Sequence, residues 1–500
     1  MAETLTEDRS PDKATPAASQ NPHHAHRWWI LGIIALSQLI VVLDATIVNI
    51  ALPTAQQSLG FSNDNRQWIV TGYALAFGSL LLLGGRLSDL VGRRPMFITG
   101  LVGFAAASAV GGAAQNFEVL VSARAAQGVF GALLAPAALS LLTVTFTDAS
   151  ERAKAFAIFG AIAGGGGAIG LILGGVLTEY LSWRWCLYVN VPLAAIAIVG
   201  GLILLKKQPK VEDAAGIDLP GTVVVVAGLV SFVYGLASAE SEGWGSPTTL
   251  ICIIAGLALI GLFAVIESRV SDPLLPLHIV WDRTRGGAFL TVAVVGIGLF
   301  AVFLFLTYYV SLTLGYSPVK TGFAFVPMIL ALIASASGFT GVVARSGPRI
   351  PVFAGLLLAA VGLALFAQLD LDSTYAANIL PGLIVTGLGV GLAVAPAFNA
   401  STSGVDPEHA GVASASVNTF QQIGGSIGTA VLSAFAASAS SSYLDGKTPS
   451  AANQALAAMH SYTTVFWWGS AIFVVGAIVC GALLRSGPVT IDPDVPVMAH

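Results

Sequence analysis

Long apolar segments recur along the whole chain and decide what it can fold into. A helix needs about 20 predominantly apolar residues to cross the hydrocarbon core of a membrane. Lipid offers no hydrogen-bond partner to an exposed backbone N–H or C=O group, so each such segment must be helical. Fourteen segments of this kind can be counted, and only 10% of the residues are charged, against about 25% in a soluble domain. The sequence therefore predicts an all-α membrane protein with 14 transmembrane helices. Their approximate limits are 28–53, 67–84, 96–114, 118–146, 153–178, 184–205, 217–239, 248–267, 286–311, 319–341, 350–368, 376–398, 410–438 and 463–484.

The distribution of Lys and Arg predicts the orientation of these helices, because cytoplasmic loops carry an excess of both residues. If the N-terminus is cytoplasmic, 17 of the 22 Lys and Arg residues lie in inner segments, four lie in outer segments, and Arg124 lies inside a span. We therefore expect both ends of the chain in the cytoplasm. Residues 1–27 and 486–500 are typical of disordered tails, and the first lacks the apolar core of a signal peptide.

Several function classes find no support in the sequence. The three cysteines, Cys186, Cys252 and Cys480, lie within apolar runs and form neither a disulfide framework nor a zinc spacing. The chain has no Gly-x-x-x-x-Gly-Lys-Ser/Thr phosphate loop and no His/Glu metal spacing in its spans. We expect no enzyme activity, no cofactor, no bound metal and no nucleic-acid partner.

A charged stretch interrupts the apolar pattern at residues 85–94, which read Gly-Arg-Leu-Ser-Asp-Leu-Val-Gly-Arg-Arg. Gly85 and Gly92 permit a tight turn and close backbone approach. Asp89 is placed to pair with Arg93 or to meet a helix N-terminus. The spacing resembles the signature between the second and third helices of transporters of the major facilitator superfamily. The alternative is an ordinary basic cytoplasmic loop. The resemblance implies a gating role for Gly85, Asp89, Gly92, Arg93 and Arg94.

A weaker echo of this stretch lies at residues 341–349, Gly-Val-Val-Ala-Arg-Ser-Gly-Pro-Arg. Glycine and arginine are again eight residues apart, but Arg345 stands where the first stretch has Asp89. We expect Asp89 to approach Arg345 or Arg349, or the start of the eleventh span, when the cytoplasmic side is closed. These side chains would then act as a latch on alternating access.

The echo also bears on the domain organisation. Facilitator-type transporters are built by parallel repetition of two six-helix halves. We therefore expect one half at 28–206 and the other at 284–485, with an inserted pair of helices at 217–267. The resemblance implies the major facilitator fold for this arrangement.

Asp44 is the only acid well inside a predicted span. An ionised carboxylate there costs at least about 2.5 kcal/mol, so such a residue is paired, neutral or functional. Its surroundings at 43–53, Leu-Asp-Ala-Thr-Ile-Val-Asn-Ile-Ala-Leu-Pro, resemble the first-helix signature of fourteen-helix drug:proton antiporters. The resemblance implies that Asp44 is the carboxylate that couples transport to protons. The alternative is an aspartate that is permanently paired with a base.

Arg124 is the one base inside a span. Residues 124, 127, 128 and 131 share a helical face, which therefore reads Arg, Gln, Gly, Gly. This face resembles the fourth-helix pattern of the superfamily, which implies that Arg124 influences the protonation of Asp44. We expect the two side chains to be in contact. The alternative is a packing cation bonded to backbone carbonyls.

The fifth span carries a stripe of glycines at positions 160, 164, 167, 170, 174 and 175, a spacing that lets helix backbones approach. Exporters of the superfamily tend to have Gly-Pro-x-x-Gly-Gly here, and Leu171 occupies the expected proline position. This departure weakens the inference of antiport. Trp183-Arg184-Trp185 and Asn190-Val191-Pro192 match the fourteen-helix exporter pattern and support it.

The residues that we predict to line a substrate cavity are polar or aromatic side chains of the spans. Aromatic residues in spans also face lipid or pack internally, and amides also join helices, so packing is the alternative for each. The set comprises Asn49, Tyr73, Phe77, Gln127, Phe303, Asn418, Gln421 and Gln422.

Together these patterns predict a proton-coupled exporter of lipophilic small molecules in a bacterial cytoplasmic membrane. Its partners would be an amphipathic small-molecule substrate, protons and the lipid bilayer, with the proton gradient in place of a cofactor, and we expect a monomer. The rivals are a proton-coupled uptake symporter of the same fold and a membrane protein without transport. The C-terminal spans contain no central acid, which argues mildly against a strictly dicationic substrate.

Overall fold

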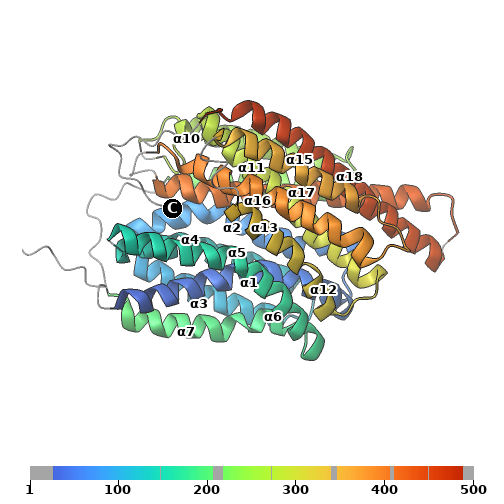
Figure 1. Cartoon of the computed structure of the whole chain (residues 1–500), viewed down its shortest axis with the longest axis horizontal. Helices are drawn as coiled ribbons and strands as arrows, with labels where there is room; N and C mark the ends of the chain where they lie inside the picture. The colour runs from blue at the N-terminus through green and yellow to red at the C-terminus, as the bar shows by residue number, and fades with distance from the viewer. Residues whose placement is uncertain are drawn as a thin grey trace, which may run out of the picture.

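The computed structural model describes residues 26–146, 148–206, 218–271, 273–338, 346–405, 410–448 and 450–487. These residues form a bundle with 14 helices that are long and apolar enough to cross a membrane, as the sequence predicts (Figure 1). The first helix begins and the last helix ends at the same end of the bundle. We call this end the terminal end and the opposite end the far end.

Six spans form what we call the N-terminal half. The fourth span packs along both the second and the third, and the fifth packs along the first. The sixth span is broken into two helices at Val189, which leads directly into Asn190. The helices are α1 (Arg27–Leu59), α2 (Asn63–Val91), α3 (Arg93–Gly112), α4 (Phe117–Thr145), α5 (Ala149–Tyr180), α6 (Trp185–Tyr188) and α7 (Asn190–Leu204).

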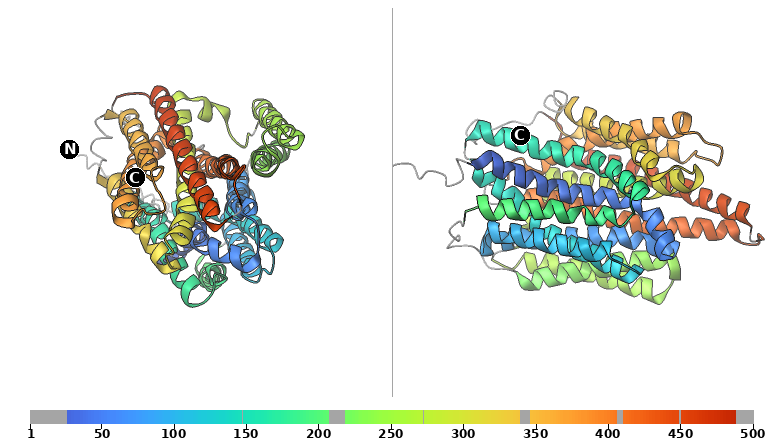
Figure 2. Two further views of the ribbon diagram at one scale, coloured as in Figure 1. Left: turned by 90° about the vertical axis from the view of Figure 1, so that its right-hand side faces the viewer. Right: turned by 90° about the horizontal axis from the view of Figure 1, so that it is seen from below.

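The next two spans form a hairpin, α8 (Leu219–Glu242) and α9 (Pro247–Glu267). α8 packs against α2 and, in the second half of the chain, α17, whereas α9 packs chiefly against α8. The hairpin therefore stands at the edge of the bundle (Figure 2). The α9 span has only 17% of its most apolar window buried within the protein, which suits a helix that faces lipid.

The last six spans form what we call the C-terminal half. Short π-helical segments, with wider turns than an α-helix, interrupt the first and fourth of them. The elements are α10 (Leu277–Trp281), α11 (Arg283–Ala301), η2 (Val302–Leu306), η3 (Tyr309–Thr313), α12 (Pro318–Ala324), α13 (Val326–Gly338), α15 (Arg349–Phe366), η4 (Tyr375–Ile379), α16 (Leu380–Thr402), α17 (Ala410–Leu444) and α18 (Ala451–Leu483).

The start of the last span differs most from the prediction, and the span before it is also longer than predicted. The sequence predicts spans at 410–438 and 463–484, but α17 continues to Leu444 and α18 begins at Ala451. The added turns are rich in alanine and polar residues, which sustain a helix without being apolar enough to count as membrane-spanning. Both helices project past the others at the far end (Figure 2).

Two extensive helix contacts join the halves. α2 lies along α17, where a Cβ atom built on Gly78 would come within 2.9 Å of the Gln422 Cβ atom. α5 lies along α12, where the backbone of Gly175 closely approaches Pro318 and Val319. Small residues thus permit the close backbone approach on which helix association in lipid depends.

Adjacent glycines of α2 allow a test of this packing. A Cβ atom on Gly84 would collide with the backbone of Ala132 in α4, whereas one on Gly85 would lie 3.8 Å from the Pro136 Cβ atom. We expect Gly84→Ala to lower the free energy of unfolding by about 1–3 kcal/mol through overpacking. Gly85→Ala should leave it unchanged or slightly higher, because alanine favours a helix. Denaturant titration of both variants in detergent measures the difference, and equal losses would contradict the packing described.

Candidate functional site

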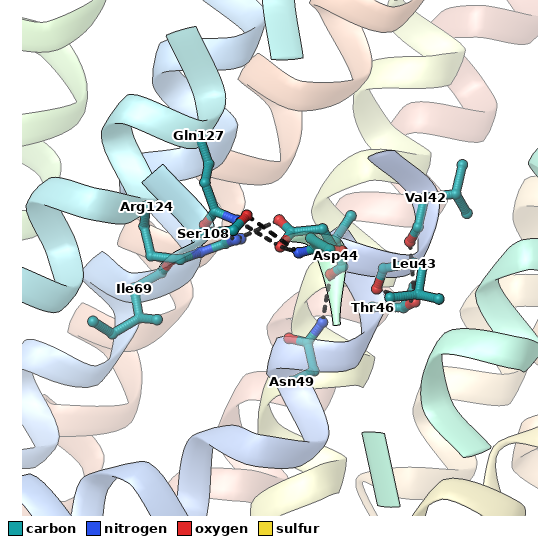
Figure 3. A network of polar contacts seen from close by, with 11 residues as sticks. Val42, Leu43, Asp44, Thr46, Asn49, Ile69, Ser108, Arg124 and Gln127 are labelled. Carbon is teal, nitrogen blue, oxygen red and sulfur yellow. Dashed lines mark hydrogen bonds and ion pairs between the residues drawn. The ribbon is translucent and has the colours of Figure 1, made fainter. Parts of the chain in front are cut away.

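A buried polar network surrounds Asp44 in the middle of α1 (Figure 3). Its carboxylate is fully enclosed, with an exposed fraction of 0%. Arg124 of α4 forms an ion pair with it, since its Nη1 atom lies 2.5 Å from Asp44 Oδ2. The contact between Asp44 and Arg124 that the sequence predicts is therefore present.

The Arg124 side chain has several partners besides Asp44. Its Nη1 atom also donates to Gln127 Oε1 at 2.8 Å, and its Nε atom donates to the Ile69 carbonyl of α2 at 3.1 Å. The guanidinium carbon lies 4.4 Å from the ring centroid of Tyr73, a cation–π contact. Arg124 thus ties α1, α2 and α4 together while it neutralises the carboxylate.

The other oxygen of Asp44 accepts two further hydrogen bonds. Gln127 Nε2 and Asn190 Nδ2 each donate to Oδ1 at 2.8 Å. The Ser108 hydroxyl of α3 accepts from Gln127 Nε2 at 2.7 Å and from Asn190 Nδ2 at 3.4 Å. The carboxylate therefore has partners from α4 and α7, and the buried charges cancel, which an apolar interior requires.

Sequence reasoning did not assign Ser108 and Asn190 to this site. Asn190 was available as a signal, because it lies in the Asn-Val-Pro motif and starts α7 inside an apolar run. Ser108 gave none, since a serine in a span commonly bonds only to its own helix. The Tyr73 hydroxyl and Asn190 Oδ1 are buried close to the network, and neither has a hydrogen-bond partner in the described part of the chain.

This arrangement can respond to a proton. A proton on Asp44 would remove the negative charge with which Arg124 pairs, while the contacts of Arg124 with Gln127, Ile69 and Tyr73 would remain. The balance of forces on α1, α2 and α4 would then change without any other residue changing its charge.

α5 lies between the part of α1 that holds Asp44 and the C-terminal half of the protein. Its glycines form two faces, and on the first of them Gly170 and Gly174 lie against Leu43, Thr46 and Ile47 of α1. α5 therefore needs glycine at these two positions, where its backbone approaches the backbone of α1 on either side of Asp44.

The second face of α5 meets α12. A Cβ atom on Gly322 would collide with the carbonyl group of Leu171, and Leu171 itself is buried. Leu171 thus lies at the contact between the halves, at the position where the exporter pattern that the sequence resembles has proline.

The charged stretch at 85–94 is mostly helical. α2 continues to Val91, α3 begins at Arg93, and Gly92 alone makes the turn, with φ of +109° that favours glycine. The close backbone approach belongs to Gly84 rather than to Gly85. Arg94 donates from Nη2 to the Leu202 carbonyl of α7 at 3.1 Å, which fastens the start of α3.

The predicted latch between Asp89 and the 341–349 stretch stays a prediction. Asp89 lies in the last turns of α2, but its side chain and the whole of Arg345 lie outside the described residues. Arg349 begins α15 and is exposed. Arg93 begins α3 at the same terminal end.

The residues predicted to line a cavity have different environments. Tyr73 and Phe77 are buried and stacked, with ring centroids 5.7 Å apart. Asn49 is buried and donates to the Ala45 carbonyl of its own helix at 3.0 Å. Gln127 belongs to the network around Asp44. The remaining members lie in the C-terminal half, where Phe303, Gln421 and Gln422 are partly exposed and Asn418 is exposed.

Among the residues with described side chains, no group of three or more His, Cys, Asp or Glu residues could hold a metal ion.

Comparison with known proteins identifies the family. The family model of the Major Facilitator Superfamily matches residues 34–429. Puromycin resistance protein pur8 of Streptomyces alboniger is 46% identical over 485 residues, which cover 96% of each chain. Cephamycin export protein CmcT of Amycolatopsis lactamdurans is 36% identical, over 80% of this chain and 83% of its own length. The human organic anion transporter MFSD10 shares the fold, with a TM-score of 0.59 at 15% identity over 91% of this chain and 99% of its own. With 14 candidate spans and a match over most of its length, this chain belongs to the major facilitator superfamily of membrane transporters.

Proposed function

We propose that this protein exports lipophilic small molecules, antibiotics among them, across the bacterial cytoplasmic membrane in exchange for protons. The observation that carries the proposal is the enclosed Asp44–Arg124 pair, the one ion pair buried in the interior of the described bundle. Relatives whose names describe puromycin resistance and cephamycin export support export as the direction and antibiotics as substrates.

The excess of Lys and Arg supports a cytoplasmic terminal end and an external far end. In the proposed cycle, Asp44 takes up a proton while the protein faces outward, which weakens its pairing with Arg124 and favours release of substrate. In the inward-facing protein the proton leaves, the pair re-forms and substrate binds between the halves.

The remaining residues have proposed roles in the same cycle. The 85–94 stretch, with Arg345 and Arg349, would stabilise closure of the cytoplasmic side. The partly exposed C-terminal side chains Phe303, Gln421 and Gln422, with Asn418, would line the substrate path. We propose a monomer, since each half supplies part of the path within one chain.

Inverted membrane vesicles with an acidified lumen test the direction, because their lumen corresponds to the outside of the cell. We expect puromycin, the compound in the name of one relative, to accumulate in the lumen against its gradient, and its addition to dissipate the pH difference. Vesicles without the protein, and vesicles treated with a protonophore, are the controls. An uptake symporter would carry the compound out of the acid lumen instead, and compounds that neither move nor consume protons would contradict the proposal.

A further inference from the structure

Arg66, close to the start of α2 at the far end, lies in an aromatic site made by the other half of the protein. Its guanidinium carbon lies 4.4 Å from the ring centroid of Tyr308 and 5.5 Å from that of Phe305, and it also interacts with the Tyr462 hydroxyl. Gln56 of α1 reinforces the contact, because Tyr308 donates to its Oε1 atom at 2.5 Å.

The chemistry of this contact makes it reversible. Arg66 is buried, yet no ion pair among the described residues includes it, and its Nε atom has no hydrogen-bond partner. Aromatic faces attract a desolvated guanidinium but do not neutralise it as a carboxylate would. Water would therefore compete well for Arg66 whenever the halves part.

The C-terminal side of the contact has an unusual backbone. Phe305 lies in the π-helical segment η2, and Tyr308 lies between η2 and η3. Wide turns of this kind interrupt the regular ladder of hydrogen bonds and are frequent at functional sites. The buried Thr307 hydroxyl in the same stretch has no hydrogen-bond partner among the described residues. The backbone segment that holds Arg66 is therefore suited to a change of conformation.

We propose that Arg66 and the aromatic side chains of Phe305, Tyr308 and Tyr462 form a reversible latch that closes the far end of the transport pathway. The proposed proton site acts on the same helix, since Arg124 Nε binds the Ile69 carbonyl, one turn along α2 from Arg66. Loss of charge on Asp44 would therefore change the forces on Arg124 and, through the first turns of α2, the position of Arg66 in the latch. This coupling rests on the proposed function, whereas the latch itself depends only on contacts between the halves.

Distances between spin labels test the latch without any transport measurement. One pair joins the far ends of the two halves, at Gln57 and Leu371, and a second pair joins their terminal ends, at Val91 and Ile350, all exposed. The labels are placed in full-length protein whose three cysteines are replaced. We expect Arg66→Gln to raise the ratio of far-end-open to far-end-closed molecules at least about tenfold, as the loss of its desolvated cation–π contacts predicts. Arg66→Lys should raise it less, since it keeps the charge.

Lys320→Gln is the matched control, because Lys320 lies 3.6 Å from the ring centroid of Tyr316 at the same end but within one half. It should leave both distance distributions unchanged. Tyr308→Leu tests the latch from the opposite side and serves if Arg66→Gln does not fold. Unchanged far-end distances in a folded variant of either residue would overturn the latch and leave the exporter proposal intact. A latch that opens on mutation, in a protein that exchanges no protons for substrate, would instead overturn the proposed function alone.

Discussion

Replacing Asp44 with asparagine is expected to reduce proton-driven transport to the level of vesicles without the protein. Asparagine has nearly the same shape but cannot take up a proton. The proton gradient can therefore no longer drive transport through this residue. Exchange of labelled for unlabelled substrate should continue, because it needs alternating access without net movement of protons. The pair of measurements, accumulation under a pH gradient and exchange without one, separates a coupling role from simple loss of folded protein.

Asp218→Asn is the matched control for this variant. Asp218 is also buried, but it caps the N-terminus of α8, where its Oδ1 atom accepts from the backbone N–H of Gly221 at 2.8 Å. Asparagine caps a helix about as well as aspartate, so transport should persist. Normal gradient-driven accumulation by Asp44→Asn would refute Asp44 as the coupling group. Loss of both accumulation and exchange in well-folded protein would contradict a role confined to coupling.

The spans and the central ion pair could be predicted from the sequence for a single physical reason. Charge is so costly in lipid that membrane spans are recognisable as apolar runs. For the same reason, an isolated acid and an isolated base within the spans are expected to pair. Asp44 and Arg124 were therefore predictable as partners, although α1 and α4 are far apart along the chain.

Residues whose roles depend on three-dimensional packing could not be predicted in this way. Arg66 counts in the sequence only as one of the few basic residues of the outer segments, yet it lies across the junction of the halves. Gly84 and Gly85 are indistinguishable as letters, and only the position of Ala132 decides which of them tolerates a side chain. Ser108 likewise acquires its role from Gln127 and Asn190, which reach it from other helices.

A double-mutant cycle on Asp44 and Arg124 is expected to reveal strong coupling in stability. Asp44→Asn leaves a buried cation without its counter-ion, and Arg124→Gln leaves a buried carboxylate without its base. Each change should cost roughly 3–5 kcal/mol of the free energy of unfolding, the usual penalty for breaking one side of a buried pair. The double variant leaves no unpaired charge, so it should be less destabilised than the sum of the single variants by at least about 2 kcal/mol. Denaturant titration of the four proteins in the same detergent measures this difference.

A second ion pair between helices, which is accessible to solvent, serves as the control for this double-mutant cycle. Arg27 at the start of α1 binds Glu151 at the start of α5 through two contacts of 2.7 Å, but both side chains remain open to solvent. Water can replace either partner there, so a cycle of Arg27→Gln and Glu151→Gln should show much weaker coupling. Geometry alone would predict similar coupling in the two cycles, because the contact distances are nearly equal. Strong coupling in the enclosed pair alone would therefore show that burial makes Asp44 and Arg124 one electrostatic unit, which a single proton can change. Additive effects at Asp44 and Arg124, within about 0.5 kcal/mol, would show that they are independent and would remove the physical basis for coupling at this site.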